Sequence, residues 1–287
     1  MIGEDRTLLM GITRFAQNEL ARLSYEVSGA ESAPTVMLLH ATLLDRSSLR
    51  PLQEKLGDRA QVIQVDARGH GASSALAGRS FSVSDMATDL YAVLEAENLA
   101  STPLTIVGHG QGAIAGLEFA RIRPDLVRKL VMIEPDALSL LDGDLDAEVI
   151  QSREAARATM RAAADAVYKG LTERALEMYL GRRWGADWKD KLSKPRLASI
   201  KRNSLALTAS LDAFDRYRIL PEELKALEVQ TMIVAAESTP SAEQRIALRL
   251  REQLPKSEMI TTADLPPASP LTGSGASLTD FIASWID

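Results

Sequence analysis

Residues 108–112 read Gly-His-Gly-Gln-Gly and join a short apolar run to a segment rich in Ala and Leu. This pattern predicts a strand, a sharp turn and a helix. Backbone N–H groups at the start of such a helix, at Gln111, can hold a carbonyl oxygen, a carboxylate or a water. The centre of the turn is Gly110, so the turn offers hydrogen-bond donors but no nucleophilic side chain.

Three histidines, His40, His70 and His109, are the only ones in the chain. His40 ends a predicted buried strand, where its ring can hydrogen-bond neighbouring loops or contact a ligand. His70 is expected to pack between loops. His109 precedes the centre of the turn and is expected to point to the side of the pocket, where it is a candidate binding residue beside His40. None of the three lies at the short spacings of metal-binding pairs, so we predict no metal site and no cofactor.

Carboxylates follow two predicted strands at Glu134, Asp136 and Glu237. Each can cap a strand end or a following helix. Each can also act as a general base, because burial raises the pKa of a carboxyl group toward neutral pH. The sequence leaves both interpretations open.

The glycines of residues 108–112 also raise the question of a dinucleotide site. Their spacing is not G-x-G-x-x-G, and Val127 and Arg128 stand where an acidic ribose-binding residue would be expected. We therefore do not expect a nucleotide cofactor.

Composition limits the class of protein. The 287 residues are 46% hydrophobic, enough for one core with an insertion, and the net charge of −6 comes without basic runs. Nucleic-acid and membrane partners are therefore not expected, whereas a small-molecule ligand is. There is no cysteine, no signal-peptide pattern and no apolar run of roughly 18 residues, so a cytoplasmic location is expected.

Strands and helices alternate through the first half of the chain, which predicts an α/β fold with a doubly wound, mostly parallel sheet. A hairpin of two edge strands is expected at 11–17 and 21–27. Further strands are predicted at 35–39, 61–65, 104–107 and 130–133, with helices at 47–57, 83–94 and 113–123.

The strand pattern disappears between residues 137 and 227. Helices are predicted there at 147–169, 171–181 and 195–217, and after them a strand at 229–234, a helix at 241–254, a strand at 258–261 and a helix at 277–286. Residues 266–275 are expected to be a loop. We predict a core of residues 1–136 and 228–287 that carries a helical cap of residues 137–227.

Four landmarks in this order carry a family resemblance: residues 38–41 (Leu-Leu-His-Ala), 66–73 (Asp-Ala-Arg-Gly-His-Gly-Ala-Ser), 82–90 and 108–112. The chain resembles the α/β-hydrolase superfamily with a helical cap between core strands six and seven. Residues 108–112 are similar to its nucleophile elbow, G-x-S-x-G. The resemblance implies an oxyanion hole formed by the N–H of Gln111 and an N–H near Ala41 or Thr42.

The chain departs from the family pattern at all three catalytic positions. Gly110 stands at the nucleophile position and leaves it vacant. Ser238, beside Glu237, stands at the expected acid position, and Asp264-Leu265 stands where a histidine should follow the eighth strand. The resemblance therefore implies a degenerate catalytic triad.

Three hypotheses follow. The first is a triad-less protein that binds a small apolar ligand, with a carbonyl or carboxylate end, between core and cap. The second is a superfamily enzyme, hydrolase or lyase-like, that uses the oxyanion donors with a carboxylate or His40 in place of a covalent serine. The third is an interaction protein that forms a homodimer through the cap helices.

Overall fold

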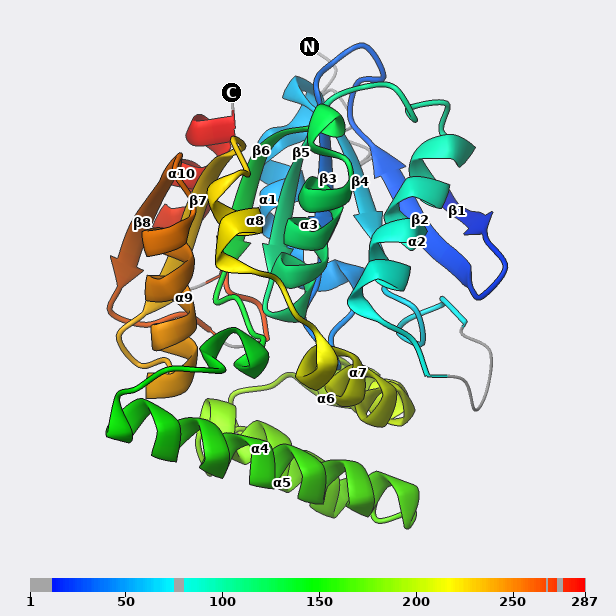
Figure 1. Cartoon of the computed structure of the whole chain (residues 1–287). Coiled ribbons are helices and arrows are strands. Elements are labelled where there is room, and N and C mark those ends of the chain that lie inside the picture. Colours follow the sequence, from blue (N-terminus) through cyan, green and yellow to red (C-terminus); the bar gives the residue numbers. More distant parts are fainter. Residues whose placement is uncertain (1–11, 75–79, 267, 273–275, 287) are drawn as a thin grey trace.

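The computed structural model describes residues 12–74, 80–266, 268–272 and 276–286, and these form an eight-stranded sheet in the order β1-β2-β4-β3-β5-β6-β7-β8 (Figure 1). The strands are β1 (Ile12–Gln17), β2 (Arg22–Ser28), β3 (Thr35–Leu39), β4 (Gln61–Val65), β5 (Leu104–His109), β6 (Val127–Ile133), β7 (Gln230–Ala236) and β8 (Ser257–Thr262). The β1–β2 and β2–β4 pairs are antiparallel, and the others are parallel. The predicted α/β fold with a mostly parallel sheet is confirmed.

Helices cover both faces of this sheet, which explains why β3, β4 and β5 are buried along their whole length. One face packs against α1 (Arg50–Leu56) and α10 (Ala276–Ile286). The other packs against α2 (Val83–Ala96), α3 (Gln111–Ile122) and α9 (Ser241–Gln253) (Figure 1). The parallel strands end at one common edge, where the loops meet.

A helical insertion lies across that edge, between β6 and β7, as predicted (Figure 1). Its apolar centre includes Tyr179 and Trp188 and also takes in Leu43 and Leu44 from the loop after β3. The insertion therefore packs directly on a core loop. Its helices are α4 (Ala147–Tyr168), α5 (Thr172–Trp184), α6 (Lys194–Asn203) and α7 (Leu207–Arg216). The short α8 (Pro221–Lys225) contacts α9, and the exact boundaries of core and cap stay a prediction.

Several expected elements are wrong in detail. The single helix expected over 195–217 is broken by a 3₁₀ turn at Ser204–Ala206, directly after Asn203, whose side-chain amide bonds the core loops. β2 is not an edge strand, since it pairs with both β1 and β4. Part of the loop expected at 266–275 lies outside the described residues.

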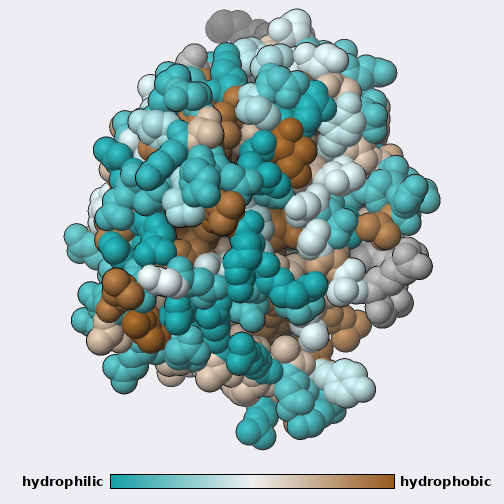
Figure 2. Space-filling model, viewed as in Figure 1, coloured by the Kyte–Doolittle hydropathy of each residue, from teal (hydrophilic) through white to brown (hydrophobic). Residues whose placement is uncertain are grey.

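The polarity of the surface and the length of the helices concern the prediction that the protein has no membrane partner. In Figure 2, hydrophilic residues cover most of the face shown, and hydrophobic residues form separate small groups on it. Within the described ranges, no helix combines the length and the apolar character needed to cross a membrane.

Candidate functional site

The turn between β5 and α3 is as sharp as the sequence predicts. Gly110 has φ 57° and ψ −120°, a left-handed conformation that favours glycine. Its N–H donates to Ile133 O at 2.8 Å, and its carbonyl oxygen accepts from the Asp136 N–H at 3.3 Å. These bonds fix the turn against the end of β6, so the residues that follow β6 lie beside the elbow.

The other two glycines of the elbow allow a close approach of α3 to the sheet. A Cβ on Gly108 would lie 2.5 Å from Ala113 N, and one on Gly112 would lie 2.6 Å from the carbonyl oxygens of Leu39 and His40. A Cβ on Gly110 would lie 2.9 Å from the Cβ of Ala41. The Ala41 methyl therefore borders the space in which a side chain at position 110 would begin.

The resemblance implies oxyanion donors at Gln111 and at Ala41 or Thr42, and the backbone hydrogen bonds leave these N–H groups available. Gln111 is the first residue of α3, so its N–H has no acceptor inside the helix. Neither it nor the N–H of Ala41 or Thr42 donates in the turn and loop hydrogen bonds found among the described residues. The dipole of α3 adds partial positive charge there. This arrangement can hold a negatively charged oxygen.

The Gln111 side chain marks a small cavity at the elbow. The cavity measures about 10 Å³, lies under Met160 and Leu211 of the insertion, and is also lined by Asp136. Gln111 Oε1 is buried and has no hydrogen-bond partner within the described part of the chain. A volume of this size admits about one water molecule. Asp136 and an unpaired amide oxygen thus share a pocket beside the oxyanion donors.

His40 and His70 connect loops through both ring nitrogens. His40 Nε2 accepts from the Ala67 N–H at 2.9 Å, so Nδ1 carries the proton and donates to Ala41 O at 2.8 Å. His70 Nε2 likewise accepts from the Leu43 N–H at 3.1 Å. Burial lowers the pKa of both rings, that of His70 to about 3. Both rings are neutral, and neither has a free lone pair.

Side-chain hydrogen bonds also hold the loop over residues 66–73. The Asp66 carboxylate accepts from the Arg46 backbone N–H at 2.9 Å and from its guanidinium at 2.6 Å. Gly71 has φ 54°, and a Cβ there would lie 2.3 Å from that carboxylate, so glycine is required. This motif therefore positions the loops below the elbow.

His109 and Glu134 lie together behind the elbow. His109 Nε2 is 3.9 Å from Glu134 Oε2, and the Thr239 hydroxyl donates to Glu134 Oε1. Burial, with added repulsion from Arg183, lowers the pKa of His109 to about 3, whereas burial raises the pKa of Glu134. His109 is therefore neutral, and the pair is not an ion pair. Glu134 also has φ 46°, a strained value for a residue other than glycine.

Asp136 belongs to a buried charge cluster that the sequence did not reveal. Arg183 Nη1 lies 2.8 Å from Asp136 Oδ2 and 3.4 Å from Glu243 Oε1, and Arg182 also pairs with Glu243. Burial raises the pKa of Asp136, and the opposing effect of Arg183 only partly offsets it. Arg183 lies in the last turn of α5, which continues to Trp184, whereas the predicted helix ended at residue 181.

Residues at the expected acid and histidine positions lie at the ends of β7 and β8. Ser238 Oγ donates to Asp264 Oδ1 at 2.8 Å, and both side chains are exposed. Glu237 is exposed as well, and its backbone carbonyl accepts from Gln244. The structure thus groups Gln111 with Asp136 and His109 with Glu134, and it leaves Glu237 in solvent. Ligand contacts of His40, Ala41, Thr42, His109 and Gln111 stay predictions.

Known proteins with similar sequences include enzymes named as hydrolases. The 2-(acetamidomethylene)succinate hydrolase of Mesorhizobium japonicum is 30% identical over 135 residues, which cover 45% of this chain and 48% of that protein. The chain thus spans about half the length of this relative. A protein of Agrobacterium fabrum named as a carbamate hydrolase, RutD, is 26% identical over 83% of this chain and 88% of its own.

Solved structures and a family profile agree on the fold. A malate-bound thermophilic esterase from Thermogutta terrifontis superposes with a TM-score of 0.74 at 20% identity, covering 96% of this chain and 97% of that one. The enol-lactonase from Burkholderia xenovorans gives 0.67 at 16% identity, with 95% and 99% covered. The profile of the family described as alpha/beta hydrolase fold matches residues 34–265. The chain therefore belongs to the α/β-hydrolase superfamily.

Proposed function

We propose that this protein is an α/β-hydrolase-superfamily enzyme that acts on a carbonyl substrate without a covalent intermediate at residue 110. The observation that carries this proposal is the pairing of Gly110 with Ala41, whose methyl group borders the space of the absent side chain. Position 110 offers no nucleophile, and the N–H groups of Ala41 and Gln111 are the proposed oxyanion donors. The names of the relatives support a hydrolytic reaction.

Asp136 is the proposed general base. It shares the small elbow cavity with Gln111, and burial raises its pKa, which makes the ionised carboxylate a better proton acceptor. Arg183, at 2.8 Å, favours the ionised form. Asp136 would accept a proton from a water as the water oxygen bonds to the carbonyl carbon. The proton would then pass to the leaving group as its bond to that carbon breaks.

The other candidates of the sequence analysis fit this role less well. The lone pair of His40 already accepts from Ala67 N–H. Glu134 is occupied by the Thr239 hydroxyl and faces His109, and Glu237 is exposed to solvent. The Ser238–Asp264 hydrogen bond, with no histidine after His109, supports the loss of the serine–acid–histidine triad.

The test is turnover of short p-nitrophenyl esters and carbamates by the wild-type protein, Asp136→Asn and the control Asp125→Asn, which alters an exposed carboxylate. Asp136→Asn should lower kcat by about 10²- to 10⁴-fold, the usual range for a general base. Serine-directed phosphonates should leave the wild-type rate unchanged. A burst of p-nitrophenol that phosphonates abolish would contradict the proposal.

Binding without turnover is the second candidate function. The size of the elbow cavity, about 10 Å³, favours it, because a substrate carbonyl and a water do not both fit until the insertion shifts. The protein would then hold a small apolar ligand through the same N–H groups. Absence of turnover on the whole panel, together with a ligand-dependent rise in Tm, would select this function over the first.

A further inference from the structure

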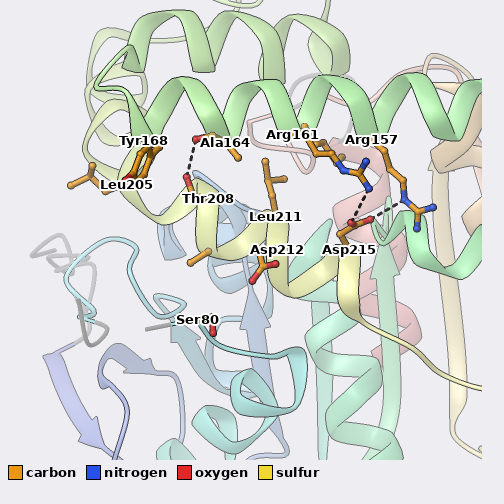
Figure 3. A pocket seen from close by; sticks show the side chains of 12 residues that line it. Ser80, Arg157, Arg161, Ala164, Tyr168, Leu205, Thr208, Leu211, Asp212 and Asp215 are labelled. Atoms are coloured by element: carbon orange, nitrogen blue, oxygen red, sulfur yellow. Dashed lines mark hydrogen bonds and ion pairs between the residues drawn. The ribbon is translucent and has the colours of Figure 1, made fainter. Parts of the chain in front are cut away.

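A cavity of about 660 Å³ lies between α4 and α7 of the helical insertion, and Ser80 of the core also lines it (Figure 3). Its volume falls within the range of small-molecule sites. Its lining includes none of Gly110, Gln111 and Ala41. Met160, Leu211 and Asp215 line both this cavity and the small cavity at Gln111, so the two are neighbours.

One end of the cavity is apolar and open. Tyr168 and Leu205 stand there side by side in Figure 3, and they are 88% and 78% exposed. Ala164 and Leu211 continue the apolar lining inward. Large hydrophobic side chains exposed at the mouth of a cavity are typical of a surface that binds an apolar group.

At the other end, the charged side chains differ in how closely they are paired with opposite charges. Asp215 is held by Arg157 at 2.8 Å, and Arg157 also pairs with Asp142 at 2.8 Å. The second carboxylate of the lining, Asp212, is held by Arg216 at 2.6 Å.

Arg161 differs from these residues. Its side chain is 73% exposed, and the carboxylate paired with it is the already occupied Asp215, at 3.8 Å. Figure 3 shows Arg161 on the same wall as Arg157 and away from Tyr168. Arg161 is therefore the lining cation with most capacity to bind an added anion.

We propose that this cavity binds a single-chain carboxylate amphiphile, with the carboxylate on Arg161 and the apolar chain directed toward Tyr168 and Leu205. The two ends of the site lie seven residues apart on α4, about 10 Å along the helix axis. This span suits a medium-length unbranched chain. The inference goes beyond the proposed function, since binding here requires neither the elbow nor turnover.

The test is calorimetric titration with decanoate, kept below its micelle concentration, and with decanol as the uncharged analogue. Arg161→Gln should weaken decanoate binding about three- to tenfold, the range for an exposed charge-assisted contact, and leave decanol unchanged. Arg202→Gln, which removes an exposed arginine of α6 outside the lining, is the matched control. It should alter neither affinity.

Two further variants test the apolar end. Leu205→Ser, at a site already exposed, should weaken both ligands without loss of Tm, and Ala164→Trp should abolish binding of both by filling the cavity. Asp136→Asn should bind decanoate as the wild type does, which separates this inference from the proposed function. Equal decanoate affinity in wild type and Arg161→Gln would overturn it.

Discussion

The Ala41 methyl group lies 2.9 Å from the position that a Cβ on Gly110 would occupy. Real Cβ atoms do not approach this closely, so the two residues are complementary in size. The resemblance of residues 38–41 and 108–112 to the superfamily's strand-end His-Gly and to G-x-S-x-G implies a glycine at the position of Ala41 and a nucleophile at that of Gly110. The extra methyl and the missing side chain therefore occur together in this chain, on two loops that meet at the oxyanion donors.

Gly110→Ser is expected to destabilise the fold by about 1–3 kcal/mol, because Ala41 must move to admit the new Cβ. Gly57→Ser is the matched control: Gly57 has a similar backbone conformation, φ 51° and ψ −130°, with no atom within 4 Å of its Cβ position. The difference between the two variants in urea unfolding measures the contact with Ala41. Adding Ala41→Gly to Gly110→Ser should recover that difference, and a failure to recover it would contradict the pairing.

A serine at position 110 should remain almost inactive even after Ala41→Gly, since a hydroxyl without a base is a poor nucleophile. Leu265 is buried in the core and is therefore a poor place for a new histidine. Asp264 already contacts Ser238, so Ser238→Asp with Asp264→His offers an acid–histidine pair. Ester hydrolysis should rise only in the quadruple variant. Comparable hydrolysis by the double variant would show that a base already serves position 110.

Local pattern was enough to predict some elements and not others. The bounds of β3 and β4 were predicted without error, and β3 shows the reason most clearly, because a strand buried on both faces reads as a continuous apolar run. The break at Asn203 and the Arg183–Asp136 pair depend on partners 160 and 47 residues away along the chain, which no local pattern encodes. Dimerisation and the lack of nucleic-acid and membrane partners stay predictions.

Stability should fall as the pH drops from about 6.5 toward 3, because His70 and His109 have a folded-state pKa of about 3 and an ordinary pKa near 6.5 when unfolded. In this window the unfolded chain binds protons that the folded chain does not, so acid favours unfolding. His109→Gln should reduce the slope of unfolding free energy against pH by about 1.4 kcal/mol per pH unit. Urea unfolding of the wild type and of His109→Gln at pH 7.5, 6, 5.5 and 5 measures these slopes. Equal slopes in the two proteins would contradict the low folded-state pKa of His109.

Asn203 should stabilise the docking of the insertion on the core. Its Nδ2 donates to Leu43 O at 3.0 Å and to Leu44 O at 2.7 Å, and its Oδ1 accepts from the Gly71 N–H at 3.1 Å. Asn203→Ala leaves these backbone groups without a partner in a buried place, which should cost about 1–3 kcal/mol.

Asn203→Ala should loosen the insertion locally as well as lower the stability of the whole fold. The three bonds join the end of α6 to the loops that follow β3 and β4. Limited proteolysis should therefore cut Asn203→Ala within the insertion faster than the wild type, while the exposed neighbour substitution Arg202→Ala should not change the rate. Loss of Tm without faster cleavage in the insertion would show that Asn203 supports the loops alone. Faster cleavage of Asn203→Ala, together with a Tm that a high concentration of decanoate restores, would show that ligand binding and docking of the insertion are linked.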